Sequence, residues 1–349
     1  MKIPIENLYY LLCFASNHIP HELAFDVASI PASSDVLDLY AYLITTGTDI
    51  LLRRGLDQGY ILQEEQTAHL RGRINMTKTV SSNVRASPRL VCQFDELSPN
   101  VLHNQILRAS VQALLYADRL SADLKNSLRS TYGKLNGIDP IQITADTFGR
   151  VQIHRNNRYY TYLLFVCRLL HSLKLPDHGS GGRIKFNDLL SDEKIMEQVF
   201  EDFLRNFYTL KQNEFYSVAP SQLRWNATAA KPEDLALLPI MKTDITMRSD
   251  QRAIIIDAKY YRSALQGNYG TEKAHSGNLY QLTAYLRSEA RNHDLIVPEG
   301  ILIYPVGDSR VDASFTIDGY PVRLYTLNLD QHWRNIERDL LQLVSAPGS

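Results

Sequence analysis

The second half of the sequence predicts an α/β fold, a sandwich of helices around one mixed sheet, and the first half predicts a mixed α+β domain. Two observations carry this prediction. Apolar residues at helical spacing alternate with short β-branched runs that end in turn residues. After residue 191 the order becomes a helix, a meander of strands, a helix, a strand and a helix, which is typical of helices packed on a single sheet.

The first half combines four predicted helices with two predicted strands. The helices are 6–15, 35–54, 104–117 and 122–134, and the strands are 60–63 and 90–94. The stretch from Arg71 to Arg89 is polar and basic, which favours a solvated hairpin or loop. The alternative is a projecting element that meets nucleic acid or a partner protein. Arg53, Arg54, Arg71 and Arg73 are possible contacts, although a solvated surface is the better interpretation of each.

The second half supplies the remaining elements. The predicted helices are 157–173, 192–210, 277–287 and 329–343, and the predicted strands are 222–225, 241–248, 252–259, 300–304 and 322–328. The pattern breaks near 139–152, so we predict one domain over 1–155 and a second over 156–349.

Composition excludes several classes of protein. The net charge is -1, and 44% of residues are hydrophobic and 21% charged, so the chain is not a globally basic nucleic-acid binder. Three scattered cysteines fit a reducing compartment. The start has no signal-peptide order and no apolar run is long enough to cross a bilayer, so a cytoplasmic protein without membrane contact is expected. The chain contains no phosphate-binding GxxxxGK[ST] loop.

Two carboxylates and a lysine form the candidate catalytic site. The run from Ala253 to Lys259 is a buried strand that ends in charge, and strand alternation puts Asp257 and Lys259 on one face. Asp244 lies on the preceding strand. Mg²⁺ takes oxygen ligands and lowers the pKa of an attacking water, and a nearby lysine can stabilise developing charge. We therefore predict Asp244 and Asp257 as metal ligands.

The hairpin between the two strands sets their register. If the turn is centred between Asp250 and Gln251, paired residues have numbers that sum to 501, so Asp244 faces Asp257. A register shift of one residue would separate them. Two other DxK strings, at 123–125 and 192–194, lie in polar helical contexts where they are solvated charges. Spacing alone leaves a metal site and a surface ion pair about equally favoured.

Neighbouring elements add further candidates. In the helix before the strands, Glu193 and Glu197 project near the apolar face, where a charge needs a reason. In the helix after them, Gln281 and Tyr285 share one face at i,i+4 spacing. The commoner interpretation of each is a half-buried helix edge or, for Glu193, a complement to the helix dipole.

The loop between these helices is rich in glycine, basic and aromatic residues. Tyr260, Arg262 and Lys273, together with Tyr285, are placed near DNA, because basic and aromatic side chains can hold a nucleic-acid backbone and stack on bases.

The sequence resembles the McrC family, the endonuclease subunits of McrBC-type modification-dependent restriction systems. The segments that carry the resemblance are 237–261, 270–286 and 300–306, the start at 3–15, and LRGRI at 70–74. It extends over nearly the whole chain. Thr243 stands where the superfamily motif often has proline, and the middle acid is aspartate rather than glutamate.

The resemblance implies a restriction-endonuclease-like fold of the PD-(D/E)xK superfamily and an N-terminal domain that docks on a partner. By position, Asp244 and Asp257 become Mg²⁺ ligands and Lys259 the catalytic lysine, while Gln281 and Tyr285 match a pair that RecB-like nucleases carry beside the site. The partner is a hexameric AAA+ GTPase ring that binds GTP and recognises methylated cytosine. The substrate is double-stranded methylated DNA, and this subunit stimulates the GTPase.

Two alternatives remain open. A non-catalytic adaptor would activate the ring without binding a cation at the aspartates. A stand-alone RecB-like repair nuclease would cut DNA without GTP or a partner.

Overall fold

The computed structural model describes residues 3–20, 25–26, 30, 35–82, 89–175, 184–261, 264–268, 271–292, 296–307 and 310–346. They form two compact units. Unit 1 contains Met1–Val36 and Asp188–Ser349, and unit 2 contains Leu37–Asn187. This division differs from the predicted boundary between residues 155 and 156.

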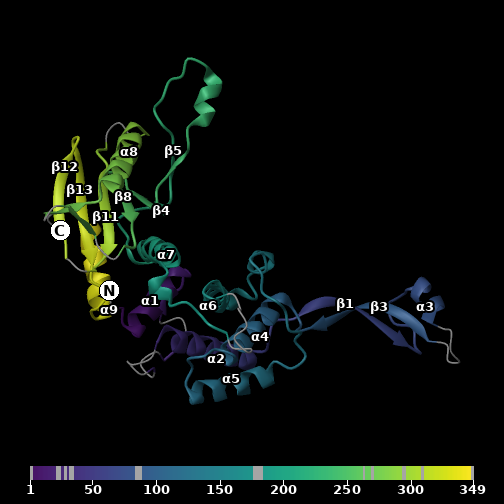
Figure 1. Cartoon of the computed structure of the whole chain (residues 1–349). Coiled ribbons are helices and arrows are strands. Elements are labelled where there is room, and N and C mark those ends of the chain that lie inside the picture. The colour runs from purple at the N-terminus through teal and green to yellow at the C-terminus, as the bar shows by residue number, and fades with distance from the viewer. Residues whose placement is uncertain are drawn as a thin grey trace. The chain divides into compact units, whose positions relative to one another are not determined.

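Unit 1 is built on a mixed six-stranded sheet in the order β12-β13-β11-β8-β7-β4 (Figure 1). The centre is parallel, because β11 pairs in parallel with both β8 and β13, and the other pairings are antiparallel. The strands are β4 (Ser217–Ala219), β7 (Ile245–Arg248), β8 (Ala253–Ala258), β11 (Glu299–Pro305), β12 (Asp312–Ile317) and β13 (Tyr320–Leu327). Two short pairs lie outside it, β5 (Gln222–Leu223) with β6 (Met241–Lys242), and β9 (Leu265–Asn268) with β10 (Thr271–Ala274).

Helices cover both faces of this sheet. Helix α8 (Ser276–Asn292) packs through Leu282 and Leu286 on the face that carries Ile255 and Leu302. Helix α7 (Glu193–Lys211) lies against the other face with α9 (Trp333–Val344). A stripe of buried apolar residues at helical spacing explains why α7 forms there, since a helix buries one face against its neighbours.

Helix α1 (Ile5–Ala15) belongs to unit 1, which explains the different division. The Asn7 amide donates to the carbonyl oxygens of Leu329 and Gln331, and the Asn206 amide donates to Phe14 at 2.9 Å. The Phe14 ring lies 5.4 Å from that of Phe207. The chain therefore starts in unit 1, forms unit 2 and returns to unit 1.

Unit 2 has a helical body. Its helices are α2 (Val36–Arg54), α4 (Leu102–Leu115), α5 (Ala122–Lys134) and α6 (Thr161–Ser172), with short 3₁₀ turns at Phe148–Arg150 and Arg158–Tyr160. Helix α4 packs against α5 and α6. A side-chain carbon added at Gly47 would come within 2.3 Å of Leu163, so this glycine permits the close approach of α2 to α6.

An arm extends from this body (Figure 1). It comprises β1 (Gly59–Thr67), β2 (Arg73–Ile74), α3 (Met76–Ser82) and β3 (Leu90–Ser98). Strands β1 and β3 pair antiparallel from Gly59 with Ser98 to Thr67 with Leu90. Several large apolar side chains of the arm face outward, including Tyr60, Leu62, Leu97, Leu70, Met76 and Val80. A surface with this many exposed apolar groups is typical of a contact with another macromolecule.

For residues 71–89 the sequence favoured a solvated hairpin or loop, with a projecting element as the alternative. The described part of this stretch contains β2 and the helix α3 and belongs to the projecting arm, while its contact with nucleic acid or a partner stays a prediction. A cluster of hydrogen bonds explains the order, because Glu64 on β1 accepts from Lys78, Asn75 and Gln93. The strands β4, β9, β10 and β12 were not predicted, and the predicted strand 241–248 is interrupted at residues 243–244.

Candidate active site

The carboxylate of Asp257 and the ammonium of Lys259 lie side by side where β8 ends. Lys259 Nζ is 3.0 Å from Asp257 Oδ2, so both side chains point to one face as strand alternation predicts. The neighbouring strand fixes this end, because the Lys259 N–H donates to the Ile303 carbonyl oxygen at 3.0 Å. Asp257 has no exposed surface and Lys259 is 8% exposed.

The predicted register places Asp244 opposite Asp257. Strand β7 pairs with β8 from Ile245 with Ile256 to Arg248 with Ala253, so each pair of numbers sums to 501. Asp244 is the next residue beyond this ladder, and its Oδ2 accepts the Ala258 N–H at 2.8 Å. The side chain of Asp244 thus takes the place of a backbone partner at the end of the strand pair.

Thr243 explains why the strand breaks before Asp244. Its hydroxyl accepts the Ser221 N–H at 2.8 Å and lies 2.8 Å from the Thr246 hydroxyl. Its own N–H donates to the Ser221 carbonyl oxygen at 3.0 Å. The threonine in place of the motif proline therefore anchors the chain and turns Asp244 toward β8.

The buried charges do not balance. Burial and then the Asp244 carboxylate raise the pKa of Asp257, which reaches about 7. Burial also raises the pKa of Asp244, against the opposing effect of Lys259. Burial alone would lower the pKa of Lys259, but the two aspartates reverse this and raise it. Neither Asp257 oxygen accepts a well-formed hydrogen bond from a described residue, although such groups are rarely left unsatisfied.

Helix α7 adds acidic groups to the site. The charge of Glu197 contributes to raising the pKa of both Asp244 and Asp257, whereas the charge of Glu193 contributes to raising the pKa of Tyr260. The structure therefore brings Glu197, and not Glu193, to the aspartates. Glu201 was missed by the sequence prediction: burial and then Asp244 raise its pKa to about 7. The sequence spacing could have identified Glu201, because residue 201 is four positions from Glu197 and shares its helix face.

Helix α8 contributes the predicted glutamine and tyrosine. The Gln281 amide donates to the Tyr285 hydroxyl at 2.7 Å. The pKa of Tyr285 is raised by burial first and also by Asp257 and Asp244, which places its hydroxyl in the field of the site. Next to them, Asn278 donates to the Tyr304 hydroxyl at 2.8 Å.

The residues placed near DNA have mixed outcomes. Tyr260 is buried, and its ring lies 6.2 Å from that of Phe200 on α7, so it is a core residue. This corrects the prediction, because at position 260 strand alternation directs the side chain to the face opposite Asp257 and Lys259. Lys273 is exposed on β10. Arg262 lies outside the described residues. Tyr261 and His275 belong to the same loop, and their ring centroids lie 5.2 Å apart.

The residues present fit a magnesium ion. Within the described ranges, no group of three or more His, Cys, Asp or Glu side chains is arranged to hold a metal by itself. Mg²⁺ usually keeps several waters and takes only one or two carboxylates with substrate phosphate. Asp244 and Asp257 supply that set, and neither Asp257 oxygen accepts a hydrogen bond from a described residue, although Oδ2 lies 3.0 Å from Lys259 Nζ.

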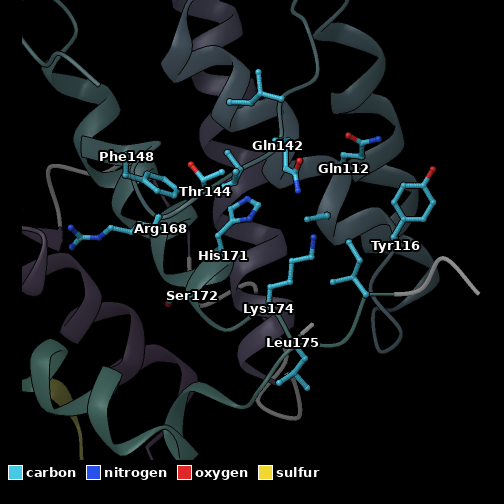
Figure 2. Close-up of a pocket in the computed structure, with 16 residues that line it drawn as sticks. Gln112, Tyr116, Gln142, Thr144, Phe148, Arg168, His171, Ser172, Lys174 and Leu175 are labelled. Atoms are coloured by element: carbon cyan, nitrogen blue, oxygen red, sulfur yellow. The ribbon is translucent and has the colours of Figure 1, made fainter. Parts of the chain in front are cut away.

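A separate cavity lies in unit 2. It has a volume of about 840 Å³ and is lined by α4, α6 and residues 141–148 (Figure 2). His171 and Lys174 point into it, and the His171 Nε2 lies 3.0 Å from the Ser110 hydroxyl. No carboxylate is among its lining residues, so it offers no ligands of the kind that Mg²⁺ prefers.

No helix in the described part of the chain has the length and apolar character to cross a membrane.

Comparison with known proteins identifies relatives along most of the chain. Residues 5–305 match the family model described as McrBC 5-methylcytosine restriction system component. The chain is 34% identical over 342 residues to the type IV methyl-directed restriction enzyme EcoKMcrBC of Escherichia coli K12. That alignment covers 98% of this chain and 97% of the relative. The resemblance predicted from the sequence is confirmed.

A solved structure shares the fold. It is a half-complex from a tetradecameric assembly of Thermococcus gammatolerans McrB AAA+ hexamers with bound McrC. The match has a TM-score of 0.52 and 16% identity, and covers 96% of this chain and 76% of that chain. A second match, to a McrBC complex of the same organism, has a TM-score of 0.41 and covers 60% of each chain.

Proposed function

Because the chain belongs to the family of McrBC 5-methylcytosine restriction system components, we propose that it is the Mg²⁺-dependent endonuclease subunit of such a system. The observation that carries the proposal is the convergence of Asp244, Asp257 and Lys259 at the end of β8. Asp257 and Lys259 are buried there and Asp244 is half-buried, so two carboxylates share one ammonium, which lies 3.0 Å from Asp257 Oδ2. Excess negative charge in a buried site is costly, so the arrangement is explained if a cation completes it.

The proposed reaction is hydrolysis of a DNA phosphodiester. Water adds to phosphorus, the bond to one bridging sugar oxygen breaks, and that oxygen takes up a proton. Mg²⁺ supplies an acidified water and neutralises phosphate charge when bound. Asp244 and Asp257 hold the ion, and Glu197 adds negative charge beside them. Lys259 places its ammonium where charge develops on the phosphate.

Helix α8 and the loop before it are proposed to hold the substrate. Gln281 donates its amide to Tyr285, which leaves the tyrosine hydroxyl hydrogen free to donate beside the aspartates. Lys273 is exposed, so its charge is available to the DNA backbone. Methylated double-stranded DNA is the proposed substrate, since the E. coli relative is a methyl-directed enzyme.

The proposed partner is an AAA+ GTPase ring that binds GTP, and the arm of unit 2 is its docking element. The Thermococcus gammatolerans assembly contains McrB AAA+ hexamers with bound McrC. In this chain three apolar residues of the arm are largely exposed to solvent: Tyr60 is 78% exposed, Leu62 63% and Leu97 53%. Tyr60 and Leu97 are paired across the strands, so these side chains form one patch. Contact with the ring would cover it and stimulate the GTPase.

The test is cleavage of methylated DNA by the complex reconstituted with its cognate GTPase. Asp257→Ala and Lys259→Ala should each reduce Mg²⁺-dependent cleavage by at least about 100-fold, while stimulation of GTP hydrolysis persists. Lys194→Ala is the matched control, because it removes an exposed lysine from another DxK string. Undiminished cutting by both variants would refute the proposal.

The same assay separates the alternatives. A non-catalytic adaptor predicts no cleavage by the wild-type complex under any condition. A stand-alone repair nuclease predicts cutting by the purified chain without GTP or partner. An intact set of two acids and a lysine favours the catalytic subunit over the adaptor.

A further inference from the structure

The arm leaves the body of unit 2 through two chain segments that one side chain holds together. Asp57 lies two residues before β1, and Pro99 follows β3 directly. The Asn104 amide on α4 donates one hydrogen to the Asp57 carbonyl oxygen at 3.0 Å and one to the Pro99 carbonyl oxygen at 2.7 Å. Both donors of the amide are thus used to join the two ends of the hairpin.

A tyrosine closes this arrangement into a ring of hydrogen bonds. The Tyr160 hydroxyl donates to Asn104 Oδ1 at 2.7 Å and accepts the Asp57 N–H at 3.0 Å. Neither Asn104 nor Tyr160 has any exposed surface. The backbone of Asp57 and the buried side chains of Asn104 and Tyr160 therefore satisfy one another.

The side chain of Asp57 makes a second set of contacts. Its Oδ2 accepts the Asn157 amide at 3.0 Å and lies 3.0 Å from His103 Nε2. The His103 ring meets that of Tyr160 edge to face, with centroids 4.6 Å apart. We call these five residues (Asp57, His103, Asn104, Asn157 and Tyr160) the root cluster. Its members come from the start of the arm, from α4 and from the segment before α6.

The hydrogen bonds of the root cluster favour a role in fixing the direction of the arm. An apolar contact tolerates sliding and rotation, whereas a hydrogen bond requires a fixed distance and angle. The buried side chains of Asn104 and Tyr160 have their donors and acceptors paired in one arrangement, because any other would leave a group unsatisfied in the interior. The paired strands beyond it are about 30 Å long at ~3.4 Å per residue, so a small rotation at the root moves the far end considerably.

We propose that the root cluster fixes the direction of the arm relative to the body of unit 2, and that this direction determines how strongly the chain activates its partner. The second half of the proposal rests on the proposed function, in which the arm docks on the GTPase ring. Asn104 and Tyr160 are positioning residues in this proposal, since both are buried and act through the segments at which the arm begins and ends.

The first experiment measures direction without any partner. Spin labels at Thr77→Cys on the arm and Ser127→Cys on α5 report the distance between them by electron–electron dipolar spectroscopy, since both sites are exposed and the three native cysteines are buried. Tyr160→Phe should widen the distance distribution. Tyr159→Phe, which removes a hydroxyl outside the cluster, should not. An unchanged distribution in a folded Tyr160→Phe protein overturns the proposal.

The second experiment measures stimulation of the cognate GTPase by the same full-length variants. Tyr160→Phe should lower the maximal stimulation by about fivefold, and Tyr159→Phe should leave it unchanged. A widened distribution with full stimulation overturns the link to activation. Should Tyr160→Phe fail to fold, Asn157→Asp, which removes the amide donor to Asp57 at similar size, takes its place in both assays with the same expectations.

The two experiments also separate this inference from the proposed function. If the wild-type chain stimulates no GTPase, the proposed function fails, while the partner-free distances still decide whether the root cluster sets the arm's direction.

Discussion

Two buried polar sites, the root cluster of unit 2 and the end of β8 in unit 1, differ in how their side chains are paired. In unit 2 the root cluster forms a network in which the Asn104 side chain makes three hydrogen bonds and the Tyr160 hydroxyl makes two. In unit 1 neither oxygen of the equally buried Asp257 accepts such a bond from a described residue, and Lys259, its ion-pair partner at 3.0 Å, also acts on Asp244. A paired network specifies one geometry, whereas two buried carboxylates that share one ammonium mark a place that a cation can complete.

The comparison is tested most strongly at the acids of α7. Glu197→Gln should lower cleavage at limiting Mg²⁺ by about 100-fold, because Glu197 acts on both aspartates and its charge would help to hold the ion. Glu193→Gln should cleave like the wild type, since Glu193 acts on Tyr260 instead. Cleavage rates over a magnesium titration provide the measurement. Equal losses in the two variants would mean that only the general acidity of the helix matters.

A second prediction concerns the exposed patch of the arm. Leu62→Asp should weaken binding to the cognate GTPase by about tenfold or more, because a charge would have to be desolvated in an apolar contact. Leu237→Asp is the matched control, since Leu237 is an exposed leucine of unit 1. Biolayer interferometry measures the affinity of each variant for the GTPase and distinguishes the two. If Leu237→Asp weakens binding and Leu62→Asp does not, the docking surface has been assigned to the wrong unit.

A third prediction uses a buried histidine of unit 2. Burial, with a contribution from Lys174, lowers the pKa of His171 from 6.5 to about 4. His171 therefore binds a proton more readily in the unfolded chain than in the folded one. Its contribution to the free energy of unfolding is highest above pH 6.5, and this contribution is lost as the pH falls toward 4. The loss should be about 1–2 kcal/mol at pH 5. Urea unfolding of wild type and His171→Gln checks it, and identical pH profiles would contradict it.

The smallest effect is expected for the stability of the metal-free protein. Asp257→Asn leaves one carboxylate and one ammonium at the site, so the folded state should gain about 1 kcal/mol while cleavage is lost. Thermal unfolding in EDTA measures the gain. Addition of Mg²⁺ should stabilise the wild type and not the variant. A loss of stability would indicate that the Asp257 carboxylate is satisfied in the metal-free protein.

Local signals account for what the sequence predicted well. Helix 122–134 begins and ends as expected, and Ser121 caps its start by accepting the Leu124 N–H. The register of Asp244 and Asp257 followed from the turn, in which the Ser249 N–H donates to the Arg252 carbonyl oxygen at 2.8 Å. Alternation along the strand then placed Lys259 beside Asp257.

Long-range contacts account for what it missed. The sequence gives no sign that Asn7 will meet the carbonyl oxygens of Leu329 and Gln331, so α1 was assigned to the wrong neighbours. Tyr260 was expected near DNA because it is aromatic and follows the lysine, yet its packing against Phe200 decides its place. The order of residues 71–82 depends on Glu64 on another strand, which local polarity does not reveal.

The return of the chain to unit 1 has a consequence for synthesis. Helix α1 is made first, but its partner α7 and the carbonyl oxygens that Asn7 binds are made after all of unit 2. During translation unit 2 can therefore fold as soon as it leaves the ribosome, whereas unit 1 must wait for its last strands and helix. A chain interrupted before its last strands would therefore hold the complete arm but not the complete sheet that positions Asp257.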